Sequence, residues 1–181
     1  MARSHQKKSP FRTSTKGPLM SDMWEFAKGF EKEGKEYYER LAKESSIEEL
    51  SGVFSILAAE EQRHYDLFDK LQKGQQAEAE NSGALGSAKE AFARLSKDND
   101  MPEVIEDAES VYRKALTLEN SSIKFYEEAL VKLEDAEQKS IVTDVLDQER
   151  SHARIISGMI EFIGRPKEWL ENAEWHHLDE Y

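Results

Sequence analysis

The sequence contains no cysteine, and this absence removes several classes of function at once. A chain without thiols forms no disulfide bond, performs no thiol catalysis and provides no cysteine ligand to iron. Any metal ion that this chain binds must therefore be held by oxygen and nitrogen atoms.

Proline and glycine are also scarce. Only 4 prolines and 9 glycines occur among 181 residues, whereas charged residues make up 34% of the chain. Long runs rich in Glu, Lys, Ala and Leu, without the alternation typical of strands, predict an all-α protein. The length suits a single domain with a core of ordinary size.

Long hydrophobic runs and an excess of positive charge are missing as well. No apolar run approaches the roughly 20 residues that a membrane-spanning helix needs. The net charge of −12 gives no support to a nucleic-acid partner, because such proteins need a basic surface to displace counterions from phosphate. We therefore expect a soluble, cytoplasmic protein that binds neither membranes nor nucleic acids.

Both ends of the chain differ in composition from the middle. Residues 1–20 contain five basic residues and no acidic one, but no apolar segment of the kind found in secretion signals. They resemble an organelle transit peptide, although a disordered tail, a remnant of cloning or a start codon assigned upstream of Met20 is preferred. We expect one domain over 21–164, and an aromatic and acidic tail over 165–181 that packs on it or on a neighbouring subunit.

Four long helices are predicted, arranged as two hairpins with short turns. Capping pairs of serine or aspartate with a glutamate three residues later mark several of the starts, and a glycine and a proline mark the last stop. The expected spans run from Asp22 to about Lys43, from Ser46 to about Gly74, from just after Pro102 to about Leu133 and from about Ala136 to Ile163. A long connection over 75–101, with a short helix beginning at Ser87, joins the hairpins.

The two predicted hairpins are copies of each other. Key residues of the first recur 88 positions later without a gap: Ala27, Glu31, Tyr38, Glu39, Glu61 and His64 correspond to Ala115, Glu119, Tyr126, Glu127, Glu149 and His152. A repeat of this kind indicates two halves related by an approximate two-fold axis, which would gather matching residues around one shared site.

The repeated glutamates are expected to face one another inside the bundle. Glu31 and Glu61 are each 15 residues from Ser46 in the first turn, so both lie roughly 22 Å from it at about 1.5 Å per residue. The second pair has the same spacing. His64 shares the helix face of Glu61, and that face otherwise carries apolar residues. Four inward carboxylates would lose much of their hydration, and two divalent cations would neutralise them.

These residues resemble the rubrerythrin-type branch of the ferritin-like superfamily. The resemblance rests on "FEKEGKEYYERLA", "LAAEEQRH", "LENSSIKFYEEAL" and "LDQERSH" and extends from residue 22 to about 164. It implies a ferritin-like four-helix bundle of two repeated hairpins joined by a long crossover. It also implies two Fe ions per chain, or Mn, held by Glu31, Glu61, His64, Glu119, Glu149 and His152.

Two tyrosines accompany this ligand set. Tyr38 and Tyr126 each follow a lone glutamate by seven residues and share its helix face. They are either plain core aromatics or hydrogen-bond partners of the ligand carboxylates, and the sequence does not separate these interpretations. No catalytic residue is expected beyond the metal ligands.

The chain departs from the rubrerythrin pattern in two respects. Rubrerythrins proper carry a cysteine-ligated rubredoxin domain, which a chain without cysteine cannot form, so electrons must come from an external donor such as a rubredoxin-like protein. Their third core helix usually supplies a further glutamate one turn after its ligand, where this chain has Ser122. This difference predicts slower reduction of peroxide.

The resemblance favours a di-iron oxidoreductase that reduces hydrogen peroxide or dioxygen, working as a homodimer or small homo-oligomer. The main alternative is a ferroxidase or iron-storage protein of the ferritin type, although 165–181 contain no obvious fifth core helix of the kind used by cage ferritins. A metal-free helical interaction bundle is a second alternative, and the four inward carboxylates disfavour it.

Overall fold

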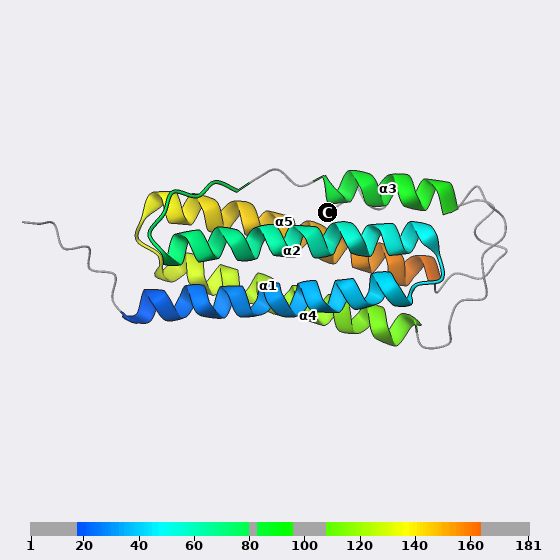
Figure 1. Cartoon of the computed structure of the whole chain (residues 1–181), viewed down its shortest axis with the longest axis horizontal. Coiled ribbons are helices and arrows are strands. Elements are labelled where there is room, and N and C mark those ends of the chain that lie inside the picture. The colour runs from blue at the N-terminus through cyan, green and yellow to red at the C-terminus, as the bar shows by residue number, and fades with distance from the viewer. Residues whose placement is uncertain (1–17, 80–82, 96–107, 164–181) are drawn as a thin grey trace, which may run out of the picture.

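The computed structural model of the chain describes residues 18–79, 83–95 and 108–163, and this part consists mainly of five helices. They are α1 (Pro18–Glu44), α2 (Glu48–Gln72), α3 (Ala84–Leu95), α4 (Ala108–Lys132) and α5 (Ala136–Ile163). Helices α1 and α2 form one antiparallel hairpin and α4 and α5 another, while α3 packs on α2 and α5 (Figure 1). The predicted all-α bundle of two hairpins is confirmed.

Several helix boundaries agree with local sequence chemistry. Helix α5 has the predicted bounds, whereas α1 begins at Pro18, four residues before the predicted start at Asp22. Proline suits the first position of a helix, because the N–H that it lacks has no partner there. Beyond the end of α2, Gly74 adopts a positive φ of 70°, which glycine tolerates and which prevents the helix from continuing.

All three predicted capping pairs are wrong, and the first of them, at Asp22, lies inside α1. Helix α2 begins at Glu48 after Ile47, and it is Ser45 rather than Ser46 whose hydroxyl accepts a hydrogen bond from the Ile47 N–H, at 3.3 Å. Helix α3 begins three residues before Ser87, whose own N–H already donates to the carbonyl of Gly83 at 3.1 Å. In a chain this rich in glutamate, the capping pattern arises without a helix start.

Some predictions fall outside the described residues. These are residues 1–17 of the leader predicted over 1–20, the helix start after Pro102, the stop at Gly164 and the C-terminal tail. Residues 18–20, predicted as the end of that leader, belong to α1 instead. Within the described ranges, no helix is both long enough and apolar enough to cross a membrane.

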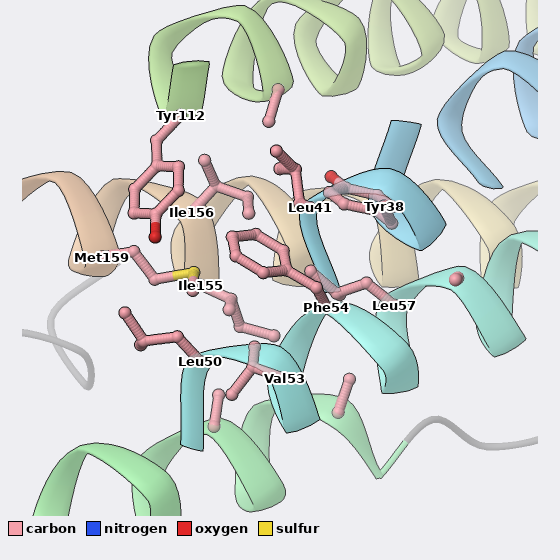
Figure 2. Packing of buried hydrophobic residues seen from close by; sticks show 14 of the residues in the cluster. Tyr38, Leu41, Leu50, Val53, Phe54, Leu57, Tyr112, Ile155, Ile156 and Met159 are labelled. Atoms are coloured by element: carbon pink, nitrogen blue, oxygen red, sulfur yellow. The ribbon is translucent and has the colours of Figure 1, made fainter. Parts of the chain in front are cut away.

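The core consists of two separate hydrophobic clusters. One lies beneath α3 and includes Phe54, which Figure 2 shows among Tyr38, Tyr112 and residues of α5. The other lies at the opposite end and includes Trp24 and Phe68. On each of the four long helices, the residues of one cluster are separated from those of the other by the predicted metal ligands. The fold therefore places a polar layer between two apolar ends.

Candidate metal centre

The structure brings all six predicted ligands together in this polar layer. Each is at most 3% exposed, so none belongs to a solvated helix face. Helix α1 provides Glu31, α2 provides Glu61 and His64, α4 provides Glu119, and α5 provides Glu149 and His152. Matching positions in the two hairpins thus converge on one place, as the repeat predicts.

The ligand atoms form two overlapping groups. In each group, the four atoms all lie within 4.8 Å of one another. The first group contains Glu31, Glu61, His64 and Glu149, and the second contains Glu61, Glu119, Glu149 and His152. Because Glu61 and Glu149 occur in both, the geometry provides two neighbouring candidate metal positions with two shared carboxylates.

Both histidines turn the same ring nitrogen towards the carboxylates. Nδ1 of His64 lies 2.9 Å from Oε1 of Glu149 and 3.2 Å from Oε2 of Glu31. Nδ1 of His152 lies 3.1 Å from Oε1 of Glu61. The two rings are stacked with their centroids 5.8 Å apart. Nδ1 is therefore the atom that each histidine would offer to a metal ion.

The other ring nitrogens contact two residues that sequence reasoning missed. Nε2 of His152 lies 2.7 Å from Oε2 of Glu60, and Nε2 of His64 lies 3.0 Å from Oε1 of Gln148. The sequence indicated that Glu60 points into the bundle, because it stands four residues before His64 on the same helix face. Gln148 is the residue 88 positions after Glu60.

The two tyrosines connect the hairpins. The hydroxyl of Tyr38 on α1 donates to Oε1 of Glu119 on α4, and the hydroxyl of Tyr126 on α4 donates to Oε1 of Glu31 on α1. Burial and the neighbouring carboxylates raise the pKa of both tyrosines well above the usual value, so both remain donors. They also pack in the two hydrophobic clusters, so the structure combines both interpretations that the sequence left open.

A serine and a glycine occupy matching positions beside the shared carboxylates. The Ser122 hydroxyl lies 2.5 Å from Oε2 of Glu149 and 2.9 Å from the carbonyl oxygen of Glu119. Its counterpart is Gly34, where an added Cβ would lie 3.2 Å from Cδ of Glu61. One hairpin thus holds its shared glutamate by a hydrogen bond, and the other leaves room for it.

The buried carboxylates and imidazoles of the centre shift one another's pKa. Burial and the charge of Glu149 raise the pKa of Glu61 and Glu119 well above the ordinary value. Burial opposes ionisation of Glu149 too, but a hydrogen bond from His64 and the charge of both histidines lower its pKa to about 2. A metal ion that binds here must therefore displace protons from the groups whose pKa is raised.

The pKa of each histidine is raised as well. Burial alone would lower the pKa of an imidazole, but the Glu31 carboxylate beside His64 and the Glu60 carboxylate beside His152 outweigh that effect.

The residues fit two divalent metal ions. Among the described residues, Oε2 of Glu119 is buried without a hydrogen-bond partner. Such oxygens are costly to bury unless a cation binds them. Four carboxylates and two imidazoles suit iron or manganese better than a closed zinc site.

Comparison with known proteins agrees with this geometry. The family model described as Rubrerythrin matches residues 23–160. The chain belongs to the rubrerythrin family. No curated protein and no solved structure gives a significant match to it.

Membership of the rubrerythrin family indicates which metal the buried cluster of glutamates and histidines would bind. Rubrerythrins typically bind iron, and both overlapping groups of this rubrerythrin have the donors to hold it. Within the matched segment, the hydroxyl of Ser122 contacts the shared carboxylate of Glu149. The two ligand groups together contain four carboxylates and two imidazoles.

Proposed function

We propose that this rubrerythrin is a non-haem di-iron oxidoreductase that reduces hydrogen peroxide or dioxygen with electrons from an external donor. The observation that carries the proposal is the pair of overlapping, fully buried groups of glutamate and histidine. We assign Glu31, Glu61, His64, Glu119, Glu149 and His152 as ligands of two Fe ions, with Mn as the other candidate. When bound, the metal pair supplies the two electrons that reduction of peroxide requires.

The residues of the chain fix and shield this centre. Four carboxylates balance the charge of two divalent ions, and the two clusters of apolar residues keep bulk water from both ends. The hydroxyls of Tyr38 and Tyr126 orient the carboxylates of Glu119 and Glu31. An imidazole held at Nε2 presents Nδ1 in a fixed direction, so the ligand set needs little rearrangement.

Other parts of the proposal concern partners. The absence of cysteine from the 181 residues means that this chain offers no cysteine-ligated iron to relay electrons, so a separate protein such as a rubredoxin-like one acts as donor. We further propose a cytoplasmic homodimer or small homo-oligomer, with no role for membranes or nucleic acids.

Rapid mixing of the reduced, iron-loaded protein with hydrogen peroxide tests the reaction. We expect a single fast phase of oxidation that consumes about one peroxide per iron pair, with sustained turnover only when an electron donor is added. The matched control is the double variant Glu61→Ala/Glu149→Ala, which lacks both shared carboxylates and should show no such phase.

The same preparation separates the enzyme from an iron store. Excess Fe(II) with dioxygen should build no mineral, and the protein should elute at the mass of a dimer or small oligomer. If the protein instead takes up many tens of iron atoms per chain into a soluble mineral, storage replaces the oxidoreductase as its function.

A further inference from the structure

The two halves of the centre differ in the residue that holds the outward nitrogen of each histidine. His152 is held by a carboxylate, Glu60, and His64 by a neutral amide, Gln148. Glu60 and Gln148 occupy matching positions of the repeat. The ligands themselves are the same in both halves, so this pair, like Gly34 and Ser122 beside the shared carboxylates, breaks the symmetry of the centre.

Glu60 is firmly placed. Its side chain is 1% exposed, with Oε2 at 2.7 Å from Nε2 of His152 and Oε1 at 3.0 Å from a guanidinium nitrogen of Arg63. His152 itself is fully buried. The imidazole beside Glu60 therefore has a short, charge-assisted contact that excludes solvent from its outer edge.

Gln148 belongs to a more open environment. It is half-buried, and it lines a cavity of about 160 Å³ together with His64, Arg63 and Lys70. The contact between its amide oxygen and Nε2 of His64 measures 3.0 Å, which is longer than the carboxylate contact on the other side. The His64 half of the centre thus has the weaker acceptor and adjoins the cavity.

The acceptor on one ring nitrogen affects how strongly the other nitrogen binds a metal ion. A carboxylate draws the N–H proton more strongly than an amide does, so the opposite nitrogen becomes the better electron donor. Arg63 balances the negative charge of Glu60, so the difference between the two halves rests on the strength of the acceptor at Nε2. Loss of such an outer partner typically weakens metal binding by about 10-fold to 100-fold.

We infer that Glu60 and Gln148 act as positioning residues that make the two metal positions unequal. The position formed with Glu119 and His152 binds a divalent metal ion more tightly, and the position formed with Glu31 and His64 binds it more weakly and exchanges it through the adjoining cavity. This inference rests on the proposed di-metal centre, and it states which of the two metal positions has the higher affinity.

Titration of the metal-free protein with Co(II) tests this rank, because cobalt is stable to air in such ligand sets and its absorption reports each binding step. We expect two steps whose dissociation constants differ by about 10-fold or more. Crystals loaded with one equivalent should show the anomalous signal of cobalt beside His152.

Reciprocal substitutions provide matched variants of nearly unchanged size. Glu60→Gln should weaken the tighter step by about 10-fold or more, and Gln148→Glu should tighten the weaker step by a similar factor. In the double variant, which exchanges the two side chains, the first cobalt ion should bind beside His64. A purely structural role for these residues would not reverse the order.

Each outcome decides between the inference and the function on which it rests. Two steps of equal affinity, or steps that stay unchanged in both variants, would overturn the inference while leaving the metal centre in place. Failure of the wild-type protein to bind cobalt at all would remove the proposed centre itself. If Glu60→Gln does not fold, as judged by circular dichroism of the metal-free protein, the Gln148→Glu titration alone decides.

Discussion

The hairpin of α1 and α2 and the hairpin of α4 and α5 carry the same ligands at matching positions but not the same neighbours. Beside the shared carboxylates, the first hairpin has Gly34 and the second has Ser122. At the outer nitrogens of the histidines, the first hairpin provides Glu60 and the second provides Gln148 at the matching position. The residues that would contact metal are thus held constant, and variation lies in the residues that contact the ligands. Two equal metal positions can become chemically distinct without any change of ligand.

The hairpins also differ in how they support the tyrosines. Helix α2 supplies a phenylalanine to each end of the core, whereas the matching positions of α5 hold aliphatic residues. Phe54 packs against Tyr38 with ring centroids 6.2 Å apart, and Phe68 packs against Tyr126 at 5.4 Å. The counterparts of Phe54 and Phe68 are Val142 and Ile156. The first hairpin therefore positions both tyrosines, including the one that belongs to the second.

The largest effect should come from removing a carboxylate that both metal groups share. Glu149→Ala removes a ligand from both positions, and we expect metal content to fall from about two ions per chain to nearly none. Glu119→Ala removes a ligand from one position only, and about one ion should remain. Elemental analysis after loading and desalting measures the difference. Equal metal content in these two variants would contradict the overlap of the groups.

Removing the metal should cause the next largest effect, and that effect should depend on pH. The metal-free fold raises the pKa of Glu61, Glu119, His64 and His152. A group whose pKa is higher in the folded protein stabilises the fold at any pH below its pKa in the unfolded chain. This contribution is lost as the pH rises through the pKa of the folded protein. The metal-free protein should therefore become less stable between pH 5 and pH 8.

Thermal melting of chelated and metal-loaded protein across this range provides the measurement. At neutral pH, a metal ion whose free concentration is a thousand times its dissociation constant adds about 4 kcal/mol to the free energy of unfolding. This corresponds to roughly 8–16 °C in Tm. The difference in Tm between loaded and chelated protein should become smaller on acidification to pH 5. Glu149, with a pKa of about 2, stabilises the fold above pH 4.5 and loses this contribution only as pH falls towards 2, below this window. Equal melting at neutral pH would count against a shared buried site.

Replacing Gly34 and Ser122 by alanine makes the two hairpins alike beside the shared glutamates. In Gly34→Ala the new Cβ would stand 3.2 Å from Cδ of Glu61, so the carboxylate must shift and cobalt binding should weaken by about 10-fold. In Ser122→Ala a hydrogen bond to Glu149 is lost, and the free energy of unfolding should fall by about 1.5–3 kcal/mol. Unchanged cobalt affinity in Gly34→Ala would show that Glu61 accommodates the extra carbon.

The smallest effect is expected when either tyrosine loses its hydroxyl. Tyr38→Phe and Tyr126→Phe remove one donor from Glu119 and from Glu31, respectively, but keep the ring packing. Metal content should stay at that of the wild type, and the rate of oxidation by peroxide should change by a few-fold to about 10-fold. Stopped-flow measurement on both variants checks this, and loss of metal in either would assign the tyrosine a larger role.

The bundle and the gathering of the six residues could be predicted because both depend on spacing. Helical periodicity places Glu61 and His64 on one face, and the repeat of 88 residues places the second set opposite the first. These relations hold for any bundle of two such hairpins. Glu60 was missed because it stands next to another glutamate in a chain rich in surface acids, and burial of a carboxylate depends on the partner that another helix provides.

Helix starts were harder to predict, for a physical reason. A cap depends on the direction in which the chain approaches the helix, and the sequence pattern does not contain that direction. Ser46 and Ser87 have a glutamate three residues later, but α2 begins after Ile47 and α3 begins before Ser87. The end of α2 was easier, because the positive φ of Gly74 follows from the conformational freedom of glycine.

Each metal group takes ligands from both hairpins, and each tyrosine donates from one hairpin to the other. With the proposed metal pair bound, a hairpin could not move away from its partner without breaking the coordination of both ions and two buried hydrogen bonds together. This coupling opposes partial opening of the loaded bundle, so its lifetime is set by the rate of metal release rather than by the fraying of any one helix. The proposed metal pair would thus slow the separation of the two repeats.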